Sequence, residues 1–163
     1  MIDQKEFERL APLACEWAKV QEATILKHGV PLTADQIADA RRAGVRDPDR
    51  IRVLVVGRIP LPEDKELADA ARRAQIITEA SQGVAIGHGV IIRADSWRNR
   101  ELLVHQLAHV AQCERSGGLQ TFVNEYLMDR RSSRNFTLGP LEEEARTLAR
   151  QICVRDPAAR PSA

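Results

Sequence analysis

The sequence is poor in aromatic residues and carries almost no net charge. Aromatic residues make up 4% of its 163 residues, and 24 Lys+Arg against 23 Asp+Glu leave a formal net charge of +1. Nucleic-acid binding needs a basic surface, and recognition of single strands also uses aromatic side chains on which bases stack. The composition therefore argues against a nucleic acid as partner.

Long apolar runs and paired cysteines are also lacking. No run approaches the ~18 apolar residues of a membrane-spanning helix, and the charged segment 1–6 has no apolar core of the kind a signal peptide needs. Cys15, Cys113 and Cys153 are far apart in the sequence, which is typical of reduced thiols and not of a disulfide framework or a cysteine zinc site. We therefore expect no membrane partner and a cytoplasmic location.

What the chain does have is enough apolar residues for a core, at 44% of the sequence. Their spacing predicts helices over residues 4–27, 33–44, 63–79, 98–115, 119–131 and 140–153. Thr33-Ala34-Asp35-Gln36 has the form of a capping box, Asp95 or Ser96 is expected to cap the helix 98–115, and Gly117-Gly118 to end it.

Two segments have the composition of strands. Residues 51–56 form the best predicted strand, and residues 83–92 form a second that contains three glycines. Glycines within a strand indicate a bulge or the close approach of another backbone. The expected fold class is therefore α+β, a helix-rich single domain with a small sheet.

The most informative feature is a histidine pair, His105 and His109, on the predicted helix 98–115. Side chains four residues apart project from one helix face, so both imidazoles can reach one ion, and zinc is the usual occupant at about 2.0–2.1 Å. The alternative is a pair of ordinary helix histidines, one of them satisfied in the core. A helical wheel places the pair opposite the expected core stripe of Leu103, Leu107, Val110 and Ala111. It therefore predicts that neither histidine fills the core.

The segment His105-Gln106-Leu107-Ala108-His109 resembles the HExxH motif of the zinc metallopeptidases called zincins. The continuation through Glu114-Arg115 and Gly117-Gly118, the later Tyr126-Leu127, and Pro140-Leu141-Glu142-Glu143-Glu144-Ala145 are similar to a little-characterised bacterial group of zincin-like proteins. The resemblance covers about residues 52–150. It implies a zincin-like metal helix followed by an acidic ligand helix, bound Zn²⁺, and a peptide or protein partner.

This resemblance also divides the chain. Residues 49–155 are expected to form the zincin-like metallopeptidase domain, and residues 156–163 a frayed tail. Residues 1–48 resemble nothing in that group and are expected to form an N-terminal helical segment, either part of the same domain or an appendage. The oligomeric state and the role of these N-terminal helices stay open.

A catalytic zinc site of this type needs a third protein ligand. In the resembling glutamate zincins the ligand is the first Glu of an ExxA element, which corresponds here to Glu142, 33 residues after His109. On the wheel of the helix 140–153, Glu142 and Glu144 both flank the core stripe and Glu143 points to water, so Glu144 remains a rival. An acidic cluster at a helix N-terminus is also favoured by the helix dipole, which explains at least one of the three.

Gln106 occupies the position of the general base of HExxH enzymes. The Glu found there takes a proton from zinc-bound water, whereas an amide of nearly the same shape has no basic site; losing a general base typically costs about 10²–10⁴ in rate. The chain is therefore either a natural pseudo-enzyme or an inactive variant with an isosteric substitution. Because the surrounding motif is otherwise complete, we favour the second interpretation and infer peptide hydrolysis as the underlying activity.

Two further site predictions concern a substrate strand and an oxyanion donor. Zincins hold a substrate against an edge strand, which assigns substrate binding to Gly87, His88 and Gly89, although a β-bulge in an interior strand explains the same glycines and His88 could be a surface residue. The Tyr126 hydroxyl is a candidate oxyanion donor, against a packing role.

Three functions compete at this point. The first is a metallohydrolase acting on peptide bonds but lacking its base, and the second is a non-catalytic zinc-stabilised module that binds a peptide or protein. The third is a helical interaction protein without metal. The substrate and its cleavage site cannot be read from these motifs.

Overall fold

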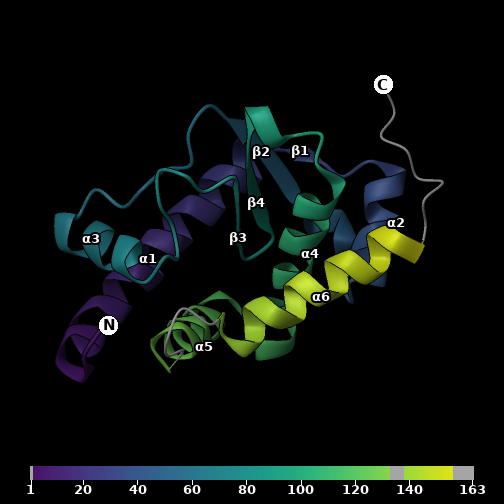
Figure 1. Ribbon diagram of the computed structural model, residues 1–163. Coiled ribbons are helices and arrows are strands. Elements are labelled where there is room, and N and C mark those ends of the chain that lie inside the picture. Colours follow the sequence, from purple (N-terminus) through teal and green to yellow (C-terminus); the bar gives the residue numbers. More distant parts are fainter. Residues whose placement is uncertain (1, 133–137, 156–163) are drawn as a thin grey trace.

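A computed structural model describes residues 2–132 and 138–155, so the predicted tail 156–163 lies outside the described residues. Over these residues the chain has six α-helices and a small mixed sheet, which confirms the α+β class (Figure 1). The elements are α1 (Gln4–His28), β1 (Val30–Pro31), α2 (Ala34–Arg42), the 3₁₀ turn η1 (Pro48–Arg50), β2 (Arg52–Val56), α3 (Lys65–Arg73), β3 (Gly83–Ile86), β4 (Gly89–Arg93), the 3₁₀ turn η2 (Ala94–Ser96), α4 (Arg100–Ser116), α5 (Leu119–Ser132) and α6 (Pro140–Arg155). No helix among them is long and apolar enough to cross a membrane.

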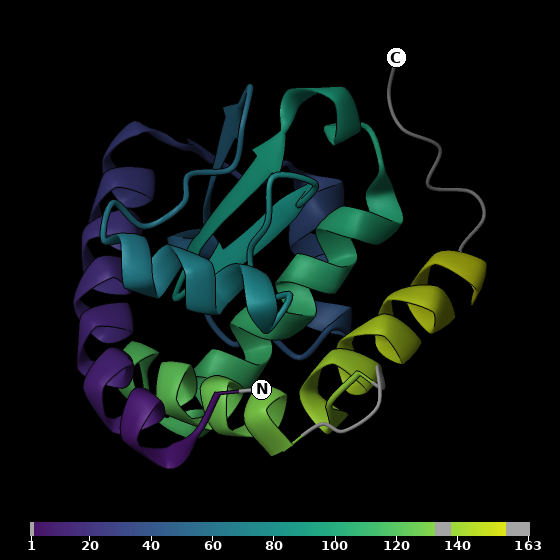
Figure 2. The same cartoon turned by 60° about the vertical axis from the view of Figure 1, so that its left-hand side comes forward.

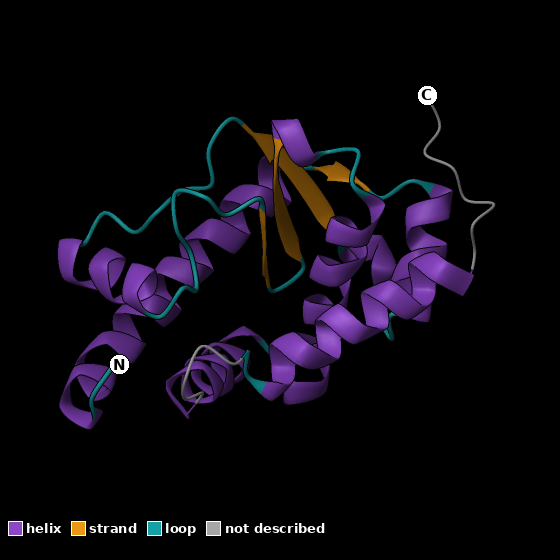
Figure 3. Cartoon of the chain, viewed as in Figure 1, coloured by secondary structure: helices purple, strands orange, loops and turns teal. Residues whose placement is uncertain are grey.

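The sheet has the strand order β1-β2-β4-β3, so β3 lies at an edge. Strands β2 and β4 are parallel, with Val53 opposite Val90, while β1 and β3 run antiparallel to their neighbours. Figure 3 shows these strands between α1 on one side and α4 on the other. The edge position leaves one side of β3 free to pair with a further strand.

The two faces of the sheet carry two cores. Side chains alternate along a strand, so Ile91 of β4 packs with Ile25 of α1, whereas Val90 and Ile92 pack with Leu107 and its neighbours on α4. Figure 2 shows α1 running the length of the molecule beside the sheet. Residues of the N-terminal 1–48 segment thus belong to both cores, through α1 on one face and α2 on the other.

Three helix-capping predictions can be compared with the structure, and two of them are confirmed. Thr33 and Gln36 form the expected capping box at α2, and Gly117 ends α4 in a left-handed conformation with φ of 95°. The expected cap of α4 by Asp95 or Ser96 is wrong, because both residues lie in η2. Asn99 caps α4 instead, and its side-chain oxygen accepts a hydrogen bond from the Leu102 N–H at 3.0 Å.

The predicted strand 83–92 is in fact a hairpin. The chain turns at Gly87, which has a φ of 62°, so that Ile86 of β3 pairs with Gly89 of β4. A positive φ is open to glycine at little cost, so Gly87 marks a turn, whereas Gly83 and Gly89 begin the two strands. The helix predicted over 63–79 is also shorter, because α3 begins after its Asp64 cap and Gln75 beyond its end takes a φ of 53°.

Candidate metal centre

Helix α4 is buried on nearly all sides. The sheet covers one face, and α6 and α5 cover much of the rest, as the crossing of α6 over α4 in Figure 1 shows. The prediction that both histidines avoid the core is therefore wrong for His109, which is only 6% exposed, whereas His105 is partly exposed. The helical wheel assumed that α4 has one buried face. In the structure α5 and α6 also cover the opposite face, so His109 is buried there.

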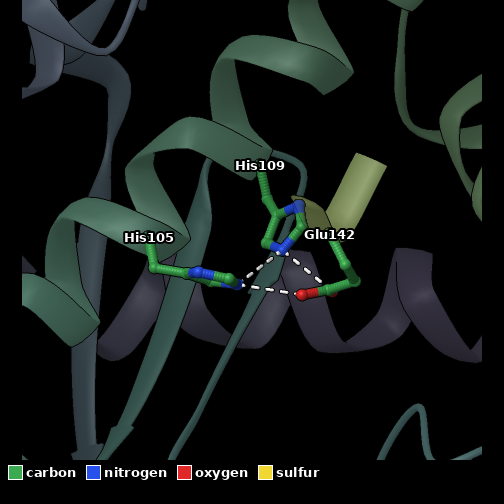
Figure 4. A group of neighbouring side chains, drawn as sticks. All are labelled: His105, His109 and Glu142. Atoms are coloured by element: carbon green, nitrogen blue, oxygen red, sulfur yellow. Dashed lines mark hydrogen bonds and ion pairs between the residues drawn. The ribbon is translucent and has the colours of Figure 1, made fainter. Parts of the chain in front are cut away.

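Three side chains from α4 and α6 converge on one point (Figure 4). Nε2 of His105 lies 3.1 Å from Nε2 of His109 and 3.1 Å from Oε2 of Glu142, and Nε2 of His109 lies 3.1 Å from Oε1 of Glu142. Ligand atoms about 2.0 Å from a tetrahedral zinc ion are about 3.3 Å apart. Two imidazoles and a carboxylate at these separations therefore fit a zinc ion with one position left for water.

Glu142 is held in place by a second helix. The Tyr126 hydroxyl of α5 donates a hydrogen bond to Oε1 of Glu142 at 2.5 Å. Burial acts to raise the pKa of Glu142, but the imidazoles of His105 and His109 and the Tyr126 hydroxyl outweigh it and hold this pKa well below its ordinary value. Burial and the charge of Glu142 raise the pKa of Tyr126 well above its usual range, so Tyr126 remains a donor.

Glu144, the rival ligand, points elsewhere. Its carboxylate accepts hydrogen bonds from Nη2 of Arg115 at 2.9 Å and from Nε2 of Gln112 at 2.7 Å. Gln112 in turn contacts Nδ1 of His109 through its Oε1 at 2.8 Å. Glu144 therefore reaches the histidines only through Gln112, a residue that the sequence prediction passed over although it lies one turn beyond His109.

Gln106 lies beneath the edge strand. It is 5% exposed, and a Cβ placed on Gly83 of β3 would stand 3.4 Å from its Cγ. Gln106 shares the lining of one cavity of about 330 Å³ with His105, His109 and the residues of β3. Within the described ranges its amide makes no side-chain hydrogen bond, so the polar end of Gln106 is available to a ligand in that cavity.

The edge strand that adjoins the cavity is β3, and the three residues predicted to bind substrate lie beyond its end. Gly83–Ile86 lies along the cavity, whereas Gly87 and His88 form the hairpin turn and Gly89 begins the interior strand β4. Gly87, His88 and Gly89 therefore do not reach the histidine cluster. The edge strand comes from the residues that precede them.

His88 belongs to a separate buried cluster around Glu114. The Glu114 carboxylate accepts hydrogen bonds from the backbone N–H of Arg46 at 2.7 Å and of Asp47 at 3.2 Å, and lies 2.9 Å from Nε2 of His88. These contacts fasten a loop and the hairpin turn to the end of α4. Asp47, His88 and Glu114 also offer three ligand atoms close together, but the backbone N–H groups already occupy the carboxylate.

Comparisons of the chain with protein-family models, with curated proteins and with solved structures returned no match.

Proposed function

We propose that this protein is a zinc-binding, zincin-like metallopeptidase relative that takes an extended peptide along β3. The observation that carries the proposal is the convergence of His105, His109 and Glu142 at mutual distances of 3.1 Å. The two imidazoles lie on α4, the helix that packs against the edge strand β3, and they stand at zinc-ligand spacing from a glutamate of α6. This arrangement supports both the ion and the peptide.

The residues of the chain have distinct roles in this proposal. A bound zinc ion supplies Lewis acidity and lowers the pKa of a coordinated water. Gln106 lines the cavity beside the cluster and can orient that water by hydrogen bonding, but it has no base to receive a proton. Tyr126 holds Glu142 and keeps one carboxylate oxygen directed toward α5.

A second function is favoured by Gln106 itself. With an amide where the base would stand, the same cavity and edge strand can bind a peptide without cutting it. The protein is then a zinc-stabilised peptide-binding or protein-binding module. The two proposals share the metal and the ligand class, and they differ in whether the Gln106→Glu variant hydrolyses peptides.

The test is zinc analysis combined with a peptidase assay on the full chain and on Gln106→Glu. We expect one zinc per chain in both, none in His109→Asn, and an unchanged content in His28→Asn, since His28 is an exposed histidine of α1. Against a mixed peptide library, Gln106→Glu should exceed the parent chain by about 10²-fold or more.

The outcomes separate the proposals. A zinc-loaded Gln106→Glu variant that cuts nothing would contradict the peptidase and leave the binding module. Absence of zinc from both proteins would contradict both, and zinc in His109→Asn would show that the ion lies elsewhere.

A further inference from the structure

The cavity that adjoins the histidine cluster is walled mainly by apolar side chains. It lies among α1, α3, β3 and α5, and its volume of about 330 Å³ is large enough for a bulky amino-acid side chain. Its aliphatic and aromatic wall includes Phe7, Leu10, Trp17, Leu67, Phe122 and Leu127. A ligand that fills this space is therefore apolar over most of its surface.

One side chain in the wall does not fit an apolar ligand. Arg130, at the C-terminal end of α5, donates from Nη2 to the carbonyl oxygen of Ala74 at 2.7 Å. Its Nε and Nη1 are buried and have no hydrogen-bond partner within residues 2–132 and 138–155. Arg130 as a residue is partly exposed, but buried guanidinium nitrogens with unused N–H donors are costly unless an anion accepts from them.

The cavity holds no spare carboxylate for Arg130. Among the described residues that line it, Arg130 is the only lysine or arginine and Glu142 the only acidic residue. The oxygens of Glu142 are already engaged by the two histidines and by Tyr126. The positive charge of Arg130 is thus left for a ligand.

Arg130 also stands close to the candidate centre. It lies one helical turn beyond Tyr126 on α5, and side chains four residues apart are neighbours on one face. Because the Tyr126 hydroxyl contacts Glu142, an anion at Arg130 lies within the reach of a short peptide whose backbone passes Gln106 and the histidines.

We propose that Arg130 binds a carboxylate on the ligand of this cavity, an apolar residue of a peptide. The peptide nature of the ligand rests on the proposed function; the carboxylate and the apolar body rest on Arg130 and the cavity wall. The carboxylate comes either from the free C-terminus of that residue or from an acidic side chain next to it.

The test is an NMR titration of the full ¹⁵N-labelled chain, as purified and after chelation of metal, that follows the Arg130 Nε–H and Trp17 indole signals. The probes are N-acetyl-leucine, which carries a terminal carboxylate, and N-acetyl-leucinamide, which does not. A third probe, N-acetyl-glutamyl-leucinamide, carries only a side-chain carboxylate, and its glutaminyl counterpart carries none. We expect a carboxylate to strengthen binding by about 10-fold or more.

Variants assign the effect to Arg130. In Arg130→Gln the ratio between acid and amide should fall to about one while the affinity for the amide stays the same, and Arg130→Lys should keep part of the preference. Arg131→Gln is the matched control, because Arg131 bonds to Ile2 and Gln4 and contacts the Phe7 ring. Thermal unfolding of each variant checks that it is folded.

Each outcome decides the proposal. Tighter binding of N-acetyl-leucine than of its amide would support the proposal with a C-terminal carboxylate. Tighter binding of the glutamyl probe than of the glutaminyl probe would support it with a side-chain carboxylate. In either case the preference must be lost in Arg130→Gln. Equal affinity for acids and amides, a preference that persists in Arg130→Gln, or no binding of any probe overturns it. A preference found in a chain that binds no zinc would keep this site and refute the metal centre, whereas zinc without the preference would do the reverse.

Discussion

Nδ1 of His109 lies 2.8 Å from Oε1 of Gln112, and this contact assigns the protons of both side chains. The Gln112 amide nitrogen donates to the Leu141 carbonyl oxygen and to Glu144, both of which only accept. The amide oxygen must therefore face His109, so Nδ1 of His109 carries the proton. With Nδ1 facing Gln112, Nε2 is the nitrogen of His109 that is left to bind a metal, on the side of His105 and Glu142.

Replacing Gln112 by leucine should weaken zinc binding without removing a ligand. The His109 ring loses the acceptor that orients it, and such outer contacts typically contribute about 10–100-fold to metal affinity. Competition with a chelator at constant pH measures the change. Gln151→Leu, an exposed position on α6, should leave the zinc affinity unaltered; an equally unaltered Gln112→Leu would contradict the role of the bond.

Glu142→Gln and Glu144→Gln test which glutamate binds the metal and which one only holds a neighbouring side chain. Glu142→Gln removes a carboxylate that faces both histidines, and its loss of zinc affinity should exceed the about 10–100-fold of an outer contact. Glu144→Gln keeps an oxygen that can accept from Gln112 and Arg115, so its loss should stay within or below that range. Chelator competition measures both, and the opposite order would assign the ligand to Glu144.

Tyr126→Phe distinguishes a positioning role from an oxyanion role. Because the hydroxyl donates to Glu142, we expect its removal to lower zinc affinity by about 10-fold, as for other outer contacts. In the Gln106→Glu background, kcat per bound zinc should then change little. Zinc affinity that stays constant while kcat falls would instead support the oxyanion donor.

Much of the fold follows from local patterns. The capping box at Thr33 and the left-handed Gly117 involve residues within one turn of each other, so the sequence contains the whole interaction. The hairpin was missed because glycine at position 87 is compatible with a bulge or a turn, and only pairing across the strands distinguishes them. The cap of α4 was misplaced because η2 separates Asp95 from the helix.

In the candidate site, too, some features follow from local sequence and others depend on how the helices pack. The spacing of His105 and His109 indicated a shared ion, and the structure brings both to Glu142. Glu142 and Glu144 flank the same stripe of α6, so the choice between them depends on how α6 crosses α4, which no local pattern contains. No local pattern distinguishes Arg130 from the neighbouring Arg131, because the unused donors of Arg130 depend on how α5 lies against the end of α3.

Glu114→Gln should destabilise the fold and change its acid sensitivity. The Glu114 side chain is 3% exposed, and an amide cannot accept from the Arg46 and Asp47 N–H groups with both of its end atoms, so a loss of about 1–3 kcal/mol in the free energy of unfolding is expected at pH 7. Burial acts to raise the pKa of Glu114, but the Arg46 N–H, His88 and the Asp47 N–H outweigh it and lower this pKa below its ordinary value.

A lowered pKa in the folded state means that the ionised carboxylate stabilises the protein above its unfolded pKa of about 4.3, and that this contribution is lost as the pH falls through the folded value. The difference between the parent chain and Glu114→Gln should therefore be largest near neutral pH and shrink below about pH 4. Urea unfolding at a series of pH values measures it, with Glu101→Gln as the control at an exposed carboxylate of α4, expected within about 0.5 kcal/mol of the parent. A gap that stays constant from neutral to acid pH would show that the Glu114 charge contributes nothing, and that the loss comes from packing alone.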